Sequence, residues 1–274
     1  MNPGLINCDL RPIYALSSRL SLESQEELAQ HLLEFYLAQD RVSLLLVHIA
    51  EREVSSHNNI HLLFREDSFN KTLLTRVLLH EQSLEYLKKL LAPMVKLIET
   101  TSKSKDDEAT RLKKVLNSVD VFIRTATQEA PFCPPLLRQL LRIVQRTVED
   151  KFGEDPFEPP FALSLLFFHW VCPAVIDPLK YHITKKSSLT HVFMTQVAAS
   201  KVLKDVATKA KREGQMAVFI EESYPSLYKF YDGVLKSSSE TGMSPRSRRN
   251  SQAVMKTPSS DQQRIFEFVS SVLK

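Results

Sequence analysis

The chain has 274 residues, 43% hydrophobic and 25% charged, a size and composition that allow a substantial apolar core. Only 5 glycines, and no Gly-rich phosphate-binding motif, argue against a nucleotide-binding loop in this chain. The net charge of +4 suits an acidic protein partner or an anionic surface, and it is too small to indicate nucleic-acid binding.

The cysteines and histidines indicate no metal site. Cys8, Cys133 and Cys172 are too widely spaced for a zinc pattern or an evident disulfide framework, which favours a reducing compartment. The histidines also lack partners at metal-ligand spacing. The N-terminus has no signal-peptide pattern, and the longest apolar run, 161–176, is shorter than the ~20 residues of a membrane span. We therefore expect no metal, no membrane span and a cytoplasmic location.

The first predicted elements are two helices. Residues 1–20 show no sustained period and are expected to be a lead-in. Ser24 and Glu27 predict a capping box for a helix with its apolar residues on one face. Asp40 is predicted to cap a second helix through residue 54, which is apolar nearly all round and should therefore be buried on several sides.

Residues 59–74 predict a loop that presents one arginine between apolar helices. Asparagines end the preceding helix, and Asp67 and Ser68 offer caps for the next one. Between them stands Phe64, an apolar anchor, followed by Arg65, whose guanidinium suits bidentate contact with phosphate oxygens. On these residues alone, an ordinary solvated loop arginine is the favoured alternative for Arg65.

Helical periodicity continues through the rest of the main region. Pro93 is expected to kink or divide the fourth helix, because it lacks an N–H donor and clashes with the preceding turn. A polar turn at 101–107 and Pro-containing loops at 130–135 and 152–160 separate the later helices. No alternating stretch indicates a strand, so the fold class is predicted to be all-α.

The chain is predicted to divide after residue 235. Residues 1–235 form the helical domain, and residues 236–260 are Ser-rich and basic, which is typical of a flexible linker. Residues 261–274 predict an amphipathic helix. Ser251, which follows two arginines, is a candidate phosphorylation site for a basophilic kinase, although an unmodified serine is at least as common for so short a motif.

Three motifs occur in order along the chain: Phe-Arg-Glu-Asp-Ser at 64–68, Phe-Cys-Pro-Pro-Leu-Leu-Arg at 132–138, and Phe-Phe-His-Trp-Val-Cys-Pro-Ala at 167–174 followed by Pro178. Together they resemble the Ras GTPase-activating protein family. Its members carry a Phe-Arg-x-x-[Ser/Thr] finger loop, a Pro-Pro-x-Leu-Arg helix start and a helix ending Phe-Leu-Arg-Phe-x-x-Pro-Ala-x-x-x-Pro. The resemblance covers most of residues 60–235 and implies an all-α domain with a finger loop between helices.

The resemblance implies a protein that is not an enzyme alone but completes the active site of a GTP-loaded Ras-family small GTPase. Arg65 would be the arginine finger supplied in trans, Phe64 would anchor its loop and Ser68 would start the next helix. GTP and Mg would belong to the partner GTPase. The partner, or regions that flank this chain, would recruit the protein to membranes. The alternative is a scaffold that binds the GTP-loaded partner without stimulating hydrolysis; relatives of that kind lack the finger arginine.

The chain departs from the family pattern beside the finger. His169 stands where the helix motif has the arginine that steadies the finger loop. We expect its ring to face the back of the loop near residues 64–66, whereas without the resemblance a core histidine is the favoured reading. Glu66 and Asp67 also place acids beside Arg65, where they could pair with it.

Four further basic residues are assigned to GTPase binding. Lys180, Lys185 and Lys186 follow Pro178, where family members often place basic residues, and Arg138 belongs to the second motif. Such charges would steer the protein toward an acidic surface. For the three lysines, a solvated charged loop is an equally good interpretation.

Overall fold

The computed structural model describes residues 10–155 and 158–236, and within them the chain forms helices and no strand. The all-α prediction is confirmed. The α-helices are, in chain order, α1 (Arg11–Ser17), α2 (Leu22–Ala38), α3 (Val42–Ser56), α4 (Phe69–Leu78), α5 (Glu81–Thr101), α6 (Glu108–Glu129), α7 (Pro135–Phe152), α8 (Phe161–Leu166), α9 (Cys172–Ile176), α10 (Thr190–Ala207) and α11 (Gly214–Lys236). Shorter 3-10 turns, η1 (Ile60–Leu62) and η2 (Ala130–Phe132), and a π-helical turn, η3 (Phe167–Val171), complete them.

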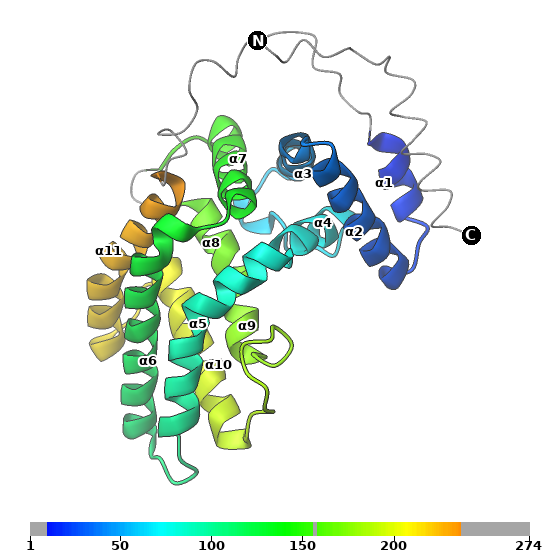
Figure 1. The fold of residues 1–274 in the computed structure, drawn as a ribbon. Helices are drawn as coiled ribbons and strands as arrows, with labels where there is room; N and C mark the ends of the chain where they lie inside the picture. Colours follow the sequence, from blue (N-terminus) through cyan, green and yellow to red (C-terminus); the bar gives the residue numbers. More distant parts are fainter. Residues whose placement is uncertain (1–9, 156–157, 237–274) are drawn as a thin grey trace, which may run out of the picture.

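The helices form two groups (Figure 1). Helices α1 to α4 make up one end of the molecule, where α2 packs against α3 and α4. In the other group α6 packs against α5, α10 and α11. Helix α7 contacts α3 on one side and α8 on the other, so it joins the two groups.

The longest apolar run, 161–176, is helical throughout, as α8, η3 and α9 in succession. Phe167 and Trp170 on η3 are fully buried. A π-helical turn inserts one extra residue, which changes the direction of the side chains around it, and such turns are frequent at functional sites. Phe168 and His169, in the same turn, are partly exposed and line a cleft.

Helix α5 is continuous although it contains Pro93. The helix is therefore not divided. Figure 1 shows it changing direction along its length, as expected where a proline removes one hydrogen bond and its ring clashes with the preceding turn.

The N-terminal region differs from the predicted lead-in. Residues Arg11–Ser17 form α1, and Leu10 and Ile13 are buried against the core. A helix of about two turns shows too little periodicity to be recognised, and its stability comes from packing rather than propensity.

Two predicted caps are wrong. The Ser21 hydroxyl, rather than the Ser24–Glu27 box, caps α2 by accepting from the Ser24 N–H at 3.2 Å. Asp40 lies in the left-handed region, with φ of 53°, and does not cap α3, because the N-cap position is Arg41. In both cases several capping residue types lie within one turn, so the pattern alone does not select the right one.

The predicted C-terminal segments lie outside the described residues, except that Lys236 ends α11. The linker at 236–260, the helix at 261–274 and the Ser251 site therefore stay predictions.

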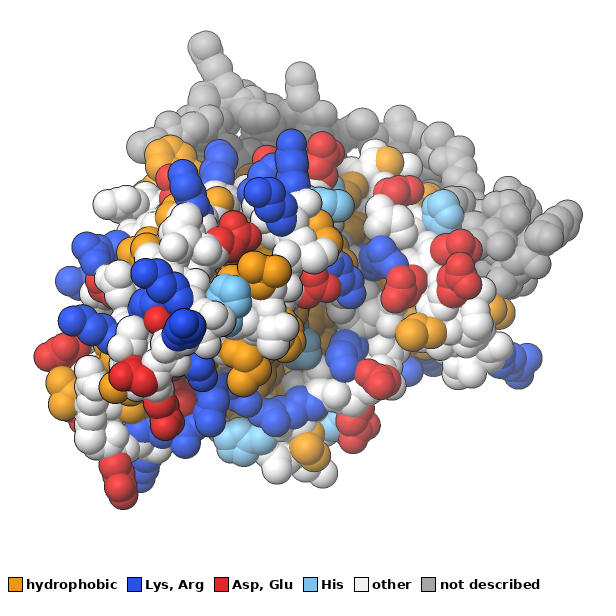
Figure 2. All heavy atoms as spheres, turned by 90° about the horizontal axis from the view of Figure 1, so that it is seen from below, with side chains coloured by type: hydrophobic (Ala, Val, Ile, Leu, Met, Phe, Trp, Pro, Cys, Tyr) orange, Lys and Arg blue, Asp and Glu red, His pale blue; other side chains and the backbone are white. Residues whose placement is uncertain are grey.

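Within the described parts of the chain, no helix combines the length and apolarity needed to cross a membrane. Figure 2 shows lysine and arginine side chains spread over the face seen there, around a hollow where hydrophobic side chains are exposed.

Candidate functional site

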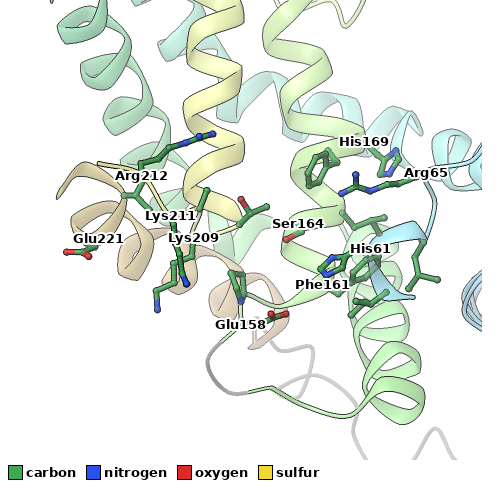
Figure 3. A pocket seen from close by; sticks show the side chains of 18 of the residues that line it. His61, Arg65, Glu158, Phe161, Ser164, His169, Lys209, Lys211, Arg212 and Glu221 are labelled. Atoms are coloured by element: carbon green, nitrogen blue, oxygen red, sulfur yellow. The ribbon is translucent and has the colours of Figure 1, made fainter. Parts of the chain in front are cut away.

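An open cleft of about 1030 Å³ lies between the loop after α3, the segment α8–η3 and the connection from α10 to α11. Figure 3 shows Arg65 and His169 side by side at one end of it, with Lys209, Lys211 and Arg212 toward the other. The cleft brings together segments that are far apart in the sequence.

The loop that carries Arg65 is a tight turn. The Leu63 N–H donates to the Ile60 carbonyl at 3.3 Å, and the Arg65 N–H donates to the Leu62 carbonyl at 3.1 Å. Between them Phe64 has φ of 58°, a left-handed conformation that is unusual for an aromatic residue and costs about 1–3 kcal/mol. Its side chain is fully buried. Phe64 therefore anchors the turn in the core, and Arg65 extends from its exposed side.

Glu53 on α3 holds this turn from behind, although its side chain is not among the predicted site residues. It is only 3% exposed, and its Oε1 accepts from the Phe64 N–H at 2.6 Å. Its Oε2 accepts from Asn70 Nδ2 at 3.1 Å. A signal in the sequence was available, because Glu53 follows Ile49 by four residues and so lies on the buried face of an apolar helix. Buried carboxylates require such partners.

Both ends of the loop are fixed as well. Ser68 is the N-cap of α4, and its hydroxyl accepts from the Lys71 N–H at 3.2 Å. Lys151 of α7 donates to the carbonyls of Val54 and His57 at 2.8 and 2.6 Å, where α3 ends and the loop begins.

The Arg65 guanidinium packs on an aromatic ring. Its Cζ lies 5.2 Å from the centroid of Phe168, and Lys204 Nζ lies 4.6 Å from the centroid of the same ring. In residues 10–155 and 158–236, the Arg65 side chain makes no hydrogen bond or ion pair. Its donors are therefore available to a ligand or partner at the cleft.

The acids beside Arg65 have other partners. Asp67 bonds to Lys71 Nζ at 2.8 Å, which lowers the pKa of the Asp67 carboxyl. Glu66 lies 3.9 Å from His57 Nε2. The pairing with Arg65 considered from the sequence does not occur.

His169 lies beside Arg65 in the cleft (Figure 3). Burial, and to a smaller extent the positive charges of Lys71 and Arg65, together lower the pKa of His169 from 6.5 to about 4. The imidazole is therefore neutral at pH 7. It makes no hydrogen bond to the loop that carries Arg65 in the described structure, so its role as loop support stays a prediction.

The basic residues assigned to partner binding lie elsewhere. Lys180, Lys185 and Lys186 are exposed in the connection between α9 and α10 and do not line the cleft. Arg138 is partly buried at the start of α7, where its Nη2 donates to the Cys133 carbonyl at 2.8 Å. Nothing in the structure tests their assignment, which stays a prediction.

Two other lysines do line the cleft. Lys209 and Lys211 are exposed in the connection after α10. Arg212, next to them, is instead held by Asp205, which accepts from its Nε at 2.9 Å and from its Nη2 at 2.8 Å. The basic run in the break between two predicted helices is the signal that would have indicated this edge.

No family model matches the chain. The human protein named Ras GTPase-activating protein 1 is 24% identical to it over 213 residues, which are 74% of this chain and 20% of that protein. The chain is similar to Ras GTPase-activating proteins. A probable Ras GTPase-activating-like protein, ngap, of Dictyostelium discoideum is 21% identical over 198 residues, or 68% of this chain and 22% of that protein. A GTPase-activating protein of Drosophila melanogaster is 22% identical over 243 residues, or 84% of this chain and 21% of that protein. The chain thus spans about a fifth of the length of these curated relatives.

Proposed function

We propose that this chain is a GTPase-activating module for a Ras-type small GTPase in its GTP-bound state, and that Arg65 is the arginine it supplies in trans. One observation carries the proposal: an exposed guanidinium with no hydrogen bond or ion pair in the described structure projects from a strained turn, anchored by the buried Phe64, beside an open cleft. The similarity to proteins named Ras GTPase-activating protein supports the partner class.

The chemistry would take place on the partner. Water attacks the γ-phosphorus of GTP, the bond to GDP breaks, and negative charge accumulates on the phosphoryl oxygens in the transition state. A guanidinium inserted there donates parallel hydrogen bonds and stabilises that charge where water is excluded. GTP and Mg would belong to the GTPase. The module would contribute Arg65 and the surface that orients it.

Only weak contacts hold the Arg65 side chain in its present position, so it can move into the active site of a bound GTPase. Its contact with Phe168 is a cation–π interaction at an exposed site, which is worth about 0.5–1 kcal/mol. Lys204 occupies the same ring, so the ring keeps a cation when Arg65 leaves it. The backbone of the turn meanwhile stays anchored through Phe64.

The test is single-turnover GTP hydrolysis by a panel of GTP-loaded small GTPases, with and without the protein. Arg65→Ala should lower the saturating rate about 10²- to 10³-fold, because the interaction is made chiefly in the transition state. The half-saturating concentration should change little. Arg65→Lys, which keeps the charge but not the planar fork, should recover only part of the rate.

Equal stimulation by wild-type protein and Arg65→Ala would remove Arg65 from the mechanism. If the wild-type protein binds a GTP-loaded GTPase in preference to the GDP-loaded form yet leaves hydrolysis unchanged, the scaffold alternative replaces the proposal.

A further inference from the structure

Polar side chains from three helices meet behind the finger loop. The Tyr14 hydroxyl of α1 donates to Asn70 Oδ1 of α4, and Asn70 Nδ2 donates to Glu53 Oε2 of α3. Glu53 Oε1 then accepts from the Phe64 N–H. The hydrogen bonds form one chain that ends at the backbone of the residue before Arg65.

The far end of this chain is itself fixed. The Tyr14 ring packs edge-on against Phe69, with ring centroids 5.5 Å apart, and the Arg52 guanidinium lies 3.9 Å from the Tyr14 centroid. Burial raises the pKa of Tyr14, so its hydroxyl stays protonated and remains a donor. Asn70 and Glu53 are 4% and 3% exposed, so water does not replace their bonds to one another.

This series of hydrogen bonds matters for Arg65 because few other contacts orient its side chain. Within the described residues its guanidinium lies over the Phe168 ring and makes no hydrogen bond or ion pair, and the neutral His169 beside it makes no hydrogen bond to the loop. The direction of the arginine therefore depends on the backbone at Phe64. A left-handed aromatic residue keeps that conformation only where its surroundings hold it, and the Phe64 N–H is held by the Glu53 carboxylate.

We propose that Glu53 is the positioning residue of Arg65, and that Asn70 and Tyr14 fix the Glu53 carboxylate in place. The proposal rests on the function proposed for Arg65. It makes α1, expected from the sequence to be a lead-in, part of the functional unit.

The order of donors and acceptors in this series of hydrogen bonds allows a matched pair of variants. Asn70 donates to Glu53, so Asn70→Asp places two carboxylates against one another and removes that bond. In the double variant Glu53→Gln with Asn70→Asp, the new glutamine amide donates to the new aspartate, and its carbonyl accepts from the Phe64 N–H. The new aspartate still accepts from Tyr14. Every bond of the chain is restored, and so is the net charge.

At pH 8 and saturating protein, Asn70→Asp should lower the stimulated hydrolysis rate roughly tenfold to a hundredfold, the effect of losing a charged hydrogen bond. The half-saturating concentration should change by less than about threefold, since the contacts with the partner stay in place. The double variant should recover the rate to within about threefold of wild type, whereas Glu53→Gln alone, whose amide meets the Asn70 amide donor to donor, should not. A folded double variant as slow as Asn70→Asp overturns the proposal.

A second measurement needs no GTPase. Amide hydrogen exchange over residues 60–69 should be faster in Asn70→Asp than in wild-type protein and should return to the wild-type rate in the double variant. Unchanged exchange in Asn70→Asp overturns the positioning role, whereas a wild-type protein that stimulates no GTPase refutes the proposed function instead.

If Asn70→Asp does not fold, Tyr14→Phe decides, because it keeps the ring and removes only the outermost hydrogen-bond donor. Faster amide exchange at residues 60–69 then supports the proposal, and unchanged exchange overturns it.

Discussion

Phe64 and Arg65 are neighbours with opposite environments. The left-handed conformation of Phe64 turns its ring into the core and leaves Arg65 exposed at the cleft. A fully buried aromatic side chain contributes on the order of 2–3 kcal/mol by leaving water, which is comparable with the cost of the strained conformation. Burial of the ring and the bond from Glu53 together make the strained turn stable.

His169 lies beside Arg65, and within the described residues it makes no hydrogen bond to the loop that carries Arg65. We predict that His169→Arg raises the stimulated rate about tenfold at saturating protein, since a guanidinium offers five donors to the loop where imidazole offers at most two. His169→Ala should lower the rate. Single-turnover hydrolysis measures both, and melting temperatures verify that the fold admits the longer side chain next to Lys71 and Arg65. A stable His169→Arg protein with an unchanged rate would contradict the prediction.

The pKa of His169 also gives a prediction for stability. Its folded pKa, about 4, lies below the unfolded 6.5, so between these values the unfolded chain binds more protons. The unfolding free energy should therefore fall as pH drops from 6.5 toward 4, by about 1–3 kcal/mol, and should owe nothing to His169 above this window. Urea unfolding at pH 7 and pH 4.5 measures the loss. His169→Gln does not titrate, so it should lose less; an equal loss would assign the effect to other groups.

At the scale of single residues, the sequence predicts the site residues that lie close together in one short motif. Phe64, Arg65 and Ser68 lie within five residues of one another, and their order carries the information. Glu53 escapes such reasoning because its partners, the Phe64 N–H and Asn70, lie 11 and 17 residues away. A carboxylate on a buried helix face indicates that a partner exists, but only the packing of α3 on the loop identifies it.

Among the elements, the long amphipathic helices agree best with prediction. Helices α6 and α10 repeat their apolar positions over several turns, so the 3.6-residue period is unambiguous. Boundaries agree less well. The cap of α2 lies at Ser21 rather than Ser24; serines at both positions satisfy the same local rule, so the rule alone does not select between them.

The start of α4 allows a direct test of what a cap contributes to function. Ser68→Ala removes the N-cap of α4, and Ser21→Ala removes the equivalent cap of α2, far from the finger in sequence. Each should lower the unfolding free energy by about 1 kcal/mol. Only Ser68→Ala should also slow stimulated hydrolysis, because its cap fixes the end of the finger loop. Urea unfolding and single-turnover kinetics measure the two effects, and equal rates for the two variants would show that the cap acts on stability alone.

For the molecule as a whole, the cleft is the feature that the sequence does not reveal. Its walls come from the loop after α3, from α8–η3 and from the segment after α10, and their meeting depends on α7 joining the two helix groups. Periodicity finds each helix but not this arrangement. The basic run that contains Lys209 and Lys211 can be read in the sequence, but its place at the cleft is visible only in the folded structure. Lys180, Lys185 and Lys186 were selected for their place after a motif.

These two basic groups make competing predictions about how a partner approaches. If the cleft receives an acidic GTPase surface, Lys209→Ser with Lys211→Ser should raise the half-saturating concentration about 2- to 10-fold, since exposed charge pairs contribute about 0.2–1 kcal/mol each. The saturating rate should stay within about twofold, because neither lysine is assigned to the chemistry, and added salt should narrow the difference from wild type. Lys88→Ser with Lys89→Ser on α5 removes the same charge from exposed positions outside the cleft and serves as the control.

A triple change of Lys180, Lys185 and Lys186 to serine tests the other basic group in the same titration. If the triple change raises the half-saturating concentration more than the cleft pair does, the partner lies over the connection between α9 and α10. If the control pair raises it as much as the cleft pair does, only the net charge of the protein matters.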